Sequence, residues 1–495
     1  MRILTYGLVL FFSLPILVLG IYLFLGLYDS TGIIHAFTQD SFVTVLKHSF
    51  ILSFLSSILA LVIGIVLAKF FYTLQNHILK SLYLLVFTIL FMIQPIMILT
   101  VAKQIALFGT LNALSQSISI ATLHLIPLAT FFWITIYRYT QTESIHIAYY
   151  ISSSPWLTYR YILFPQIRYK LILAFLFLFI LVFINQEVPS ILGYRTYTEE
   201  LVSQMTLMEN MSTIVRSALP SFVLVGTLTL GIIIWFKKNP LNFSNTISSQ
   251  KISPEYFGKI MLGILYLSLG FTFFILTKAS LQSTIENLLT NNVEVIVQTL
   301  VFAFFVSLFT LAIGIVLQYL LQCYASRLVH IIWVSSLLFY LLLPHSLVSL
   351  ALLDIYQTMG VFSPEGDFIL FFIGYMLVLL PIASLLLYLF SITQKKDYFL
   401  DFFPIPLYHR WMKITLPKQW TIWTIIFLVL MAFTLNELSV SILLVPPGFE
   451  TMIVKIYNLL HYGDKATIAF LSLVQLLFLI GCFVILSLLS KKVLK

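Results

Sequence analysis

Few side chains in this sequence combine a reactive type with a suggestive spacing, and two carboxylates are the clearest of them. Glu187 and Glu437 lie 250 residues apart, each near the end of a long apolar run, with Asn185 and Asn436 close beside them. Ionisable groups within apolar segments of membrane length are costly and usually face a cavity or a partner. We therefore treat these four residues as candidates for the lining of a polar path. The open alternative is that each carboxylate only pairs with a neighbouring helix or reaches the membrane interface.

Motifs for catalysis are missing from the sequence. It contains no G-x-x-x-x-G-K-[ST] phosphate loop, no H-E-x-x-H, no G-x-S-x-G and no C-x-x-C. These patterns hold nucleotide phosphates, zinc, a nucleophilic serine or redox thiols. The nine histidines are scattered, and His461 has no second histidine at ligand spacing. We predict no catalytic residue, no metal site and no cofactor bound by this chain, which is therefore not expected to be an enzyme.

The composition indicates what kind of structure holds these residues. The chain has 495 residues, of which 60% are hydrophobic and only 9% are charged. A soluble domain carries about 25% charged residues, whereas a helix that crosses a bilayer needs about 20 apolar residues in a row. Within hydrocarbon, backbone groups must bond inside their own segment, so such runs are predicted to be helices. We assign the net charge of +9 to loops beside the membrane rather than to a nucleic-acid partner.

Twelve apolar runs of spanning length, six in each half, predict an all-α polytopic membrane protein. Their approximate bounds are 5–27, 46–72, 80–102, 120–137, 170–193, 217–236, 259–277, 296–322, 329–353, 367–391, 421–445 and 466–489. An even number of spans leaves both termini on one side of the membrane. Seven basic residues fall on the other side, namely Lys47, Lys103, Arg195, Arg216, Lys278, Lys455 and Lys465. The remaining 20 of the 27 lie on the side of the termini, which predicts that both termini are cytoplasmic.

The two halves are predicted to be parallel repeats. The sequence IGIVL at 63–67 recurs at 313–317, an offset of 250 (313 − 63), and Pro165 recurs as Pro417, an offset of 252 (417 − 165). Two ordered matches at nearly one offset indicate an internal duplication. Six spans per half place both copies in the same orientation, related by an axis along the membrane normal.

The repeats define the predicted domains. The first half covers 1–236 and the second covers 259–495. The polar stretch 237–258 contains Ser, Asn and Pro and is predicted to be a cytoplasmic linker.

Each half carries a polar loop between its fourth and fifth spans, at about 139–169 and about 392–420. Both loops are too long for a tight helix connection and have room for a short helix on the membrane surface. Pro165 and Pro417 end the loops, and proline suits the first turn of a helix, so they are predicted to begin the fifth spans. The loops are candidate docking points for a partner. The alternative is an ordinary cytoplasmic loop held by lipid headgroups.

The loop pattern resembles the EAA loop of binding-protein-dependent ABC importer permeases, which reads roughly E-A-A, three residues, G, nine residues and I-x-L-P. The matching ends are YILFP at 161–165 and KITLP at 413–417. Where the family has E-A-A, this chain has HIA at 146–148 and DYF at 397–399. The resemblance implies that the ATPase-coupling residues are Ala148, Ser152, Pro155, Pro165, Asp397, Pro406 and Pro417.

The outer segments are most similar to those of fused permeases in the iron(III)/thiamine-type branch. The segments are EVPSILG at 187–193 and the stretch 446–463, which contains PPGFET and NLLHYG. The resemblance implies a type I importer permease fold. Candidates for an outer gate or dock are Pro189, Gly193, Pro446, Pro447, Gly448, His461 and Tyr462. A plain interfacial loop is the alternative reading of each segment.

The family implies a function for the whole chain. It would be the membrane-spanning subunit of an ABC importer in a bacterial inner membrane, in contact with membrane lipid. The implied partners are a cytosolic ATPase dimer, which uses ATP and Mg, and a periplasmic or lipid-anchored binding protein. Iron(III) is the first expectation for the cargo, before thiamine, polyamine or phosphonate-like solutes. The alternatives are a gradient-driven secondary transporter with twelve helices and, third, a membrane scaffold or intramembrane enzyme.

Overall fold

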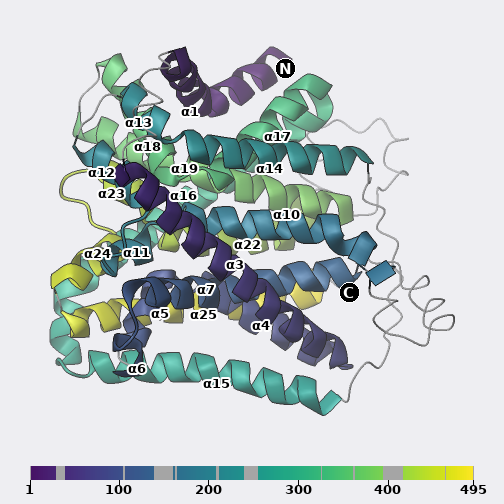
Figure 1. The fold of residues 1–495 in the computed structure, drawn as a ribbon, viewed down its shortest axis with the longest axis vertical. Helices are drawn as coiled ribbons and strands as arrows, with labels where there is room; N and C mark the ends of the chain where they lie inside the picture. Colours follow the sequence, from purple (N-terminus) through teal and green to yellow (C-terminus); the bar gives the residue numbers. More distant parts are fainter. Residues whose placement is uncertain are drawn as a thin grey trace. The chain divides into compact units, whose positions relative to one another are not determined.

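The computed structural model describes most of the chain. The described residues are 2–28, 40–103, 106–138, 160–161, 164–207, 211–238, 255–324, 326–360, 363–393, 416–462 and 464–493. Within them the regular structure is helical, and no strand occurs in these ranges (Figure 1). Nine helices of this part are long and apolar enough to cross a membrane, or up to twelve if each of three bent helix pairs is one span. The chain is an all-α multi-pass membrane protein.

The chain folds as two compact units. Unit 1 contains Met1–Leu25 and Ala279–Lys495, and unit 2 contains Gly26–Lys278. These two units do not coincide with the two halves of the sequence. The difference is that each half contributes its first helix to the other unit. Helix α1 (Arg2–Tyr28) packs with helices of the second half, and most of α15 (Glu255–Ser280) packs with helices of the first half.

Unit 2 is built around a close crossing of two long helices. Its helices are α3 (Asp40–Thr73), α4 (His77–Met92), α5 (Pro95–Ala102), α6 (Ala106–Gly109), α7 (Ala113–Arg138), α10 (Phe164–Phe183), α11 (Glu187–Ile191), α12 (Tyr197–Thr206), α13 (Met211–Ser217), α14 (Leu219–Lys238) and most of α15. A Cβ added to Gly64 of α3 would lie 3.0 Å from the Cβ of Ala129 on α7. The Trp133 indole donates to the Leu61 carbonyl at 2.9 Å. A residue without a side chain thus lets the two backbones meet.

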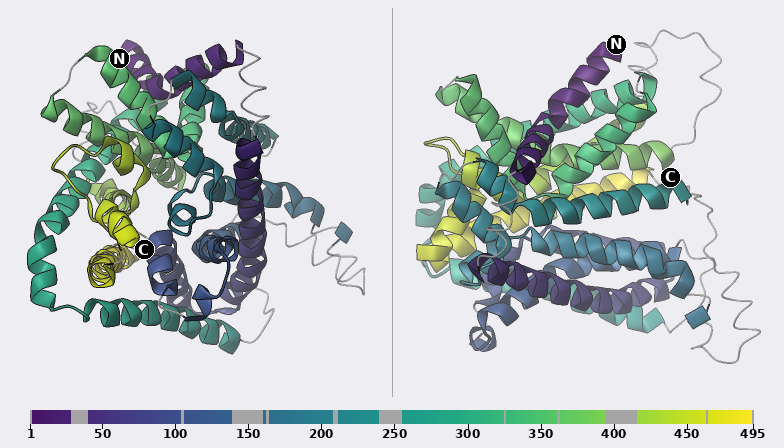
Figure 2. Two further views of the ribbon diagram at one scale, coloured as in Figure 1. Left: turned by 60° about the vertical axis from the view of Figure 1, so that its left-hand side comes forward. Right: turned by 45° about the horizontal axis from the view of Figure 1, so that its top comes forward.

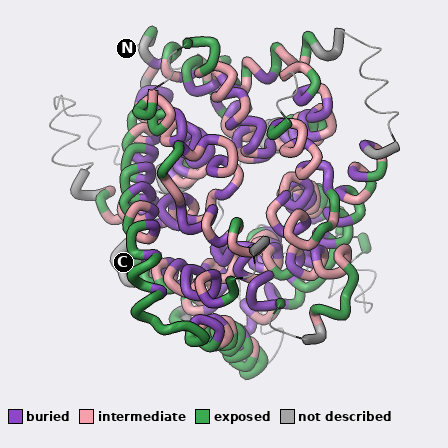
Figure 3. The backbone as a smooth tube through the Cα atoms, turned by 90° about the vertical axis from the view of Figure 1, so that its left-hand side faces the viewer, coloured by how far each residue is buried: buried purple, intermediate pink, exposed green. Residues whose placement is uncertain are grey.

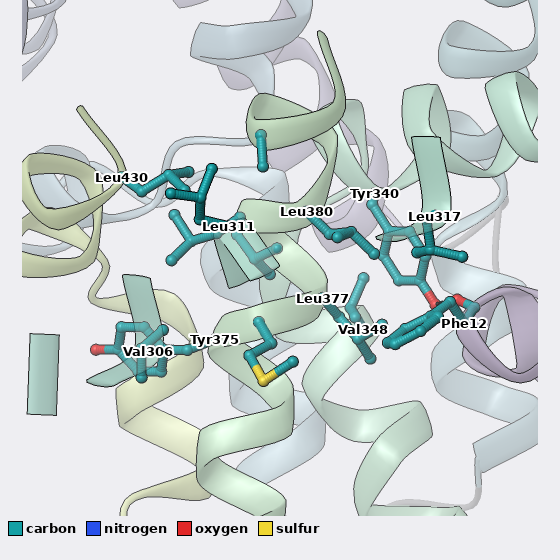
Figure 4. Close-up of a cluster of buried hydrophobic side chains, with 14 of the residues drawn as sticks. Phe12, Val306, Leu311, Leu317, Tyr340, Val348, Tyr375, Leu377, Leu380 and Leu430 are labelled. Atoms are coloured by element: carbon teal, nitrogen blue, oxygen red, sulfur yellow. Dashed lines mark hydrogen bonds between the residues drawn. The ribbon is translucent and has the colours of Figure 1, made fainter. Parts of the chain in front are cut away.

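Unit 1 repeats this kind of crossing with different helices. Besides α1, it contains α16 (Ile285–Tyr324), α17 (Arg327–Leu342), α18 (His345–Met359), α19 (Pro364–Thr393), α22 (Leu416–Asn436), α23 (Ser439–Leu444), α24 (Met452–Tyr462) and α25 (Lys465–Val493). A Cβ at Gly314 of α16 would lie 3.1 Å from Leu387 Cδ1 and 3.5 Å from the Ala383 Cβ, both on α19. Figure 4 shows the buried apolar core of this unit, to which α1 contributes Phe12.

The first helix of each half has specific contacts in the unit it joins. In unit 1, the Tyr340 hydroxyl donates to the Phe12 carbonyl at 2.7 Å, and the Ser13 and Ser336 hydroxyls lie 2.9 Å apart. In unit 2, Leu262 of α15 belongs to the apolar cluster around Phe71 of α3. Figure 2 gives two further views in which both helices can be followed.

The long helices bury small and hydroxyl-bearing residues among their apolar ones and expose mainly apolar residues. On α16, Ala303, Ser307 and Thr310 are buried, whereas Phe304 and Leu308 on neighbouring faces are exposed. Figure 3 shows this alternation of buried and exposed surface along the helices. Because lipid solvates apolar side chains, packing in a membrane favours small residues and hydroxyls between helices. This arrangement agrees with a membrane environment and would be unfavourable in water.

Several predicted spans are broken, which corrects their expected form. The run 80–102 forms α4 and α5, bent by 86°, and the run 329–353 forms α17 and α18, bent by 113°. The run 217–236 is α14 with α13 before it, bent by 54°. Pro95 and Pro344 lie in the first two breaks, where a proline lacks an N–H and disfavours helical geometry in the residue before it. Hydropathy does not register such a break, since the residues on both sides remain apolar.

The fifth spans are also interrupted near their ends. After α10 the chain leaves the helix at Ile184 to Gln186 and resumes as the short helix α11, and after α22 it resumes as α23. The predicted run 421–445 is therefore a shorter helix followed by a separate turn of helix. The four residues proposed to line a path all lie at these interruptions.

Candidate functional site

A polar junction in unit 1 joins two of these breaks. We call it the unit-1 junction and define it by His345, Glu437, Tyr375 and Ser441. His345 is the first residue of α18, after the bend, and Glu437 lies between α22 and α23. Both come close together because α18 and α23 pack on the same helix, α19, near Gly374. A Cβ at Gly374 would meet Leu444 at 2.8 Å and Leu352 at 3.6 Å, so only a glycine fits here without displacing a side chain.

An ion pair lies at the centre of the unit-1 junction. His345 Nδ1 is 2.9 Å from Glu437 Oε2, and the other carboxylate oxygen accepts the Val440 N–H at 3.2 Å. The side chains of His345 and Glu437 are 23% and 12% exposed, so water reaches both only in part. The carboxylate lies at the first turn of α23, where unpaired N–H groups favour a negative charge, and it contacts the His345 side chain at the start of α18. Glu437 is thus held from two helices at once.

The backbone freed by the break in α22 is bonded by side chains. The Tyr375 hydroxyl donates to the Glu437 carbonyl at 2.7 Å and lies 2.5 Å from Ser441 Oγ. From α25, Gln475 Nε2 donates to the Leu435 carbonyl at 2.7 Å and to Asn436 Oδ1 at 2.9 Å. Irregular backbone at membrane depth requires such partners, since hydrocarbon offers none.

Unit 2 has a corresponding junction, with other residues at the positions of His345 and Glu437. We call it the unit-2 junction: the break between α4 and α5 together with the break between α10 and α11. Pro95 is the first residue of α5, as His345 is the first residue of α18. Each lies three residues after the last residue of the preceding helix. His124 of α7 lies with Nδ1 3.1 Å from the Ile93 carbonyl that the bend frees. Val188 of α11 packs with Leu99 of α5 in an apolar cluster.

The two candidate carboxylates do not occupy the same place in the fold. Glu437 follows the first residue of α22, Leu416, by 21 positions (437 − 416). Asn185 follows the first residue of α10, Phe164, by the same 21 positions (185 − 164). Both also donate an N–H to the carbonyl three residues earlier. The structural counterpart of Glu437 is therefore Asn185, whereas Glu187 is the first residue of α11 and is partly buried.

The outer segments form turns and short helices. Gly193 and Gly448 have φ angles of +69° and +83°, a left-handed conformation that glycine adopts without strain. Pro189 and Pro446 are buried, whereas Pro447 is exposed. His461 and Tyr462 are the last two residues of α24, and their side chains lie outside the described part.

One hydrogen bond anchors each outer helix to a long span. The first N–H of α12, at Tyr197, donates to Ser49 Oγ of α3 at 2.7 Å. The first N–H of α24, at Met452, donates to Thr299 Oγ1 of α16 at 2.9 Å. In the first turn of α12, burial raises the pKa of the Glu199 carboxyl, and the Thr196 N–H that it accepts opposes this rise.

The predicted coupling loops are only partly described. Pro165 is the second residue of α10 and Pro417 the second residue of α22, so both prolines begin the helices as expected. Pro165 is exposed. The other predicted coupling residues lie outside the described residues: Ala148, Ser152, Pro155, Asp397 and Pro406.

Sequence reasoning missed three residues of the unit-1 junction, namely His345, Tyr375 and Ser441, and it also missed Gln475, which bonds the backbone beside the junction. The available signal was that each is a polar residue within an apolar run, a test that we applied only to carboxylates. In the described ranges, no group of three or more His, Cys, Asp and Glu residues has the arrangement of a metal site. The junction joins helix ends through the ion pair and the hydrogen bonds described above.

Comparisons with protein-family models, with curated proteins and with solved structures found no match to this chain.

Proposed function

We propose that this chain is the membrane-spanning permease of an ABC importer, built as two parallel six-helix repeats. The observation that carries the proposal is the position of the two loop-ending prolines. Pro165 and Pro417 are each the second residue of a long helix, of 20 and 21 residues respectively, that ends in an interruption. Two loops of similar sequence thus lead into two helices of similar design, as a pair of docking points for two ATPase subunits requires.

Other matched contacts support the repeat. Gly64 packs against Ala129 in unit 2, and Gly314 packs near Ala383 in unit 1. The hydroxyl anchors of α12 and α24 come from Ser49 and Thr299, which lie 250 positions apart (299 − 49). In a duplicated unit, we expect glycines and hydroxyl residues that are separated by the repeat length to make the same kind of contact in both copies.

The broken helices favour a transporter over a scaffold. A straight helix satisfies its own backbone, so an interrupted one needs partners such as Tyr375 and Gln475. Transporters commonly form their binding sites from discontinuous helices. A scaffold has no need for such breaks at corresponding places in two units.

The importer would work with separate partners. A cytosolic ATPase dimer would dock on the two loops, and a periplasmic or lipid-anchored protein would deliver the cargo, with iron(III) as the first candidate. Both termini would face the cytoplasm of a bacterium, with α12 and α24 on the outer side. ATP can drive the cycle only through contacts that differ between the inward-open and outward-open states.

A gradient-driven transporter is the second candidate, and the His345–Glu437 pair is the observation that favours it. Intramembrane His and Glu residues are the groups that proton-coupled transporters use. Such a protein would need no ATPase and would stop when the proton gradient collapses.

Purification of the chain from native membranes separates the two. We expect an ATPase to copurify in stoichiometric amount and to be lost, about fivefold or more, in a Pro165→Ala/Pro417→Ala variant. The matched control is Pro127→Ala/Pro381→Ala, which changes the prolines inside α7 and α19. A well-folded preparation without ATPase, or equal loss in both variants, would overturn the importer.

A further inference from the structure

We propose that His345 and Glu437 form a latch that holds the start of α18 against the break between α22 and α23, and that unit 1 opens at this junction only when the pair separates. The proposal concerns unit 1 alone and does not depend on what drives the transport.

The pair is not needed to build a junction of this shape. Unit 2 makes the same two breaks with Pro95 and Asn185 at the corresponding positions, and neither side chain carries a charge. Replacing a buried ion pair by neutral groups is often without cost to a fold. These two positions carry a charged pair in unit 1 and uncharged side chains in unit 2, which points to a role of the pair beyond packing.

The pair joins two helix ends that are otherwise held by apolar contacts. On the α18 side, Val348 and Leu352 pack in the core of unit 1, and on the α23 side Val440 and Leu444 do the same. Apolar contacts can slide, whereas a 2.9 Å contact between Nδ1 and a carboxylate is directional. Separation of the two side chains is thus the discrete step in any movement of α18.

The surroundings make this contact responsive to water. An ion pair is strong in a medium of low dielectric constant and weak in water. Both side chains are partly exposed, so they lie at the edge of the protein interior. Entry of water between the ends of α18 and α22 would weaken the ion pair, and removal of that water would strengthen it. The junction would therefore have two states, closed with the pair formed and open with the pair separated.

Ser346, the residue after His345, gives a direct measure of opening. Its side chain is 1% exposed, so a cysteine there reacts with a water-soluble maleimide only when α18 moves. In the purified full chain with Cys323→Ser and Cys482→Ser, we expect Glu437→Gln to raise the labelling rate of Ser346→Cys about tenfold or more. His345→Gln should do the same, and the double variant should label no faster than either single one.

Unit 2 provides the matched control. Ile96 lies 250 positions before Ser346 (346 − 96), is 0% exposed and is also the second residue of its helix. Labelling of Ile96→Cys should change less than about threefold with Asn185→Ala, and also with Glu437→Gln, because a latch acts locally.

Three results would overturn the latch. The first is an unchanged labelling rate of Ser346→Cys in Glu437→Gln. The second is a double variant in which the effects of the two single substitutions on that rate multiply. The third is an equal rise in the labelling rate of Ile96→Cys, which would indicate general loosening of the protein. If Glu437→Gln does not fold, the test compares His345→Lys with His345→Gln instead. A latch predicts slow labelling with the retained cation and fast labelling without it, and equal rates for the two would reject it.

Discussion

The unit-1 and unit-2 junctions solve one problem with different chemistry. Each unit interrupts two helices and must bond the carbonyls that the interruptions free. Unit 2 uses His124 at one break and, at the other, the Thr198 hydroxyl, which donates to the Phe183 carbonyl at 2.7 Å, whereas unit 1 uses Tyr375 and Gln475 and adds the His345–Glu437 pair. The comparison teaches that helices can be interrupted at corresponding places with different bonding, because the positions of His345 and Glu437 in unit 1 hold the uncharged residues Pro95 and Asn185 in unit 2.

The largest difference between the junctions is expected when their central residues are truncated. Glu437→Ala leaves His345 without its partner and should lower the free energy of unfolding by about 2–4 kcal/mol, less than for a fully buried pair because both groups are partly exposed. Asn185→Ala should cost about 1 kcal/mol. Thermal unfolding in detergent compares the two variants, and equal losses would contradict a distinct role for the ion pair.

The helix crossings should differ by a smaller amount. Gly64→Ala sets a Cβ against the Ala129 backbone, which cannot yield, and should cost about 2 kcal/mol. Gly314→Ala meets the end of the flexible Leu387 side chain and should cost less than about 1 kcal/mol. Melting temperatures of the two variants give the comparison. The reverse order would show that the crossing in unit 1 is the tighter one.

The hydroxyl anchors should behave alike in the two units. Ser49→Ala and Thr299→Val each remove the acceptor for a buried N–H and should each cost about 1–2 kcal/mol. Hydrogen exchange at Tyr197 and Met452 reports the loss, with each variant serving as the control for the other. A large effect in one unit alone would weaken the case for a repeat.

The contact of α1 with α18 should give the smallest effect. Tyr22→Phe removes the hydroxyl that donates to Asp354 Oδ2 at 3.1 Å and should cost about 0.5–1 kcal/mol. Leu8→Ala, on the same helix and partly buried in the core of unit 1, is the packing control and should cost more. An unchanged melting temperature in both variants would argue against the packing of α1 in unit 1.

Some features of the fold follow from the sequence because they depend on composition and simple chain geometry. Long apolar runs must be helices in a bilayer, and the prolines Pro165 and Pro417 were expected at helix starts, where they lie. Pro95 and Pro344 were equally visible in the sequence. The sharp bends at these prolines could not be predicted from the sequence, since a proline within a long apolar run is compatible with a bend of any size.

The candidate site was predicted only in part because it depends on packing between distant segments. Glu437 was chosen for its cost in an apolar run, and it pairs with a residue of another helix, which is the alternative to a polar path that the sequence left open; its place in a path stays a prediction. Its partner, His345, is 92 residues away and could be found only once α18 and α23 were seen to pack on α19. The sequence analysis matched Glu187 to Glu437 by an offset of 250 positions. The helices α10 and α22 begin 252 positions apart (416 − 164), so the residue that matches Glu437 is Asn185.

The exchange of first helices has a consequence for how the protein is made. Phe12 is synthesised 328 residues before Tyr340, whose hydroxyl bonds its carbonyl in the finished unit. At about 5–20 residues per second, α1 waits roughly 15–65 s in the membrane before its partners emerge from the ribosome. During that time its serine and its proline face lipid or another protein. The N-terminal helix is thus the first part of unit 1 to be made and among the last to be packed.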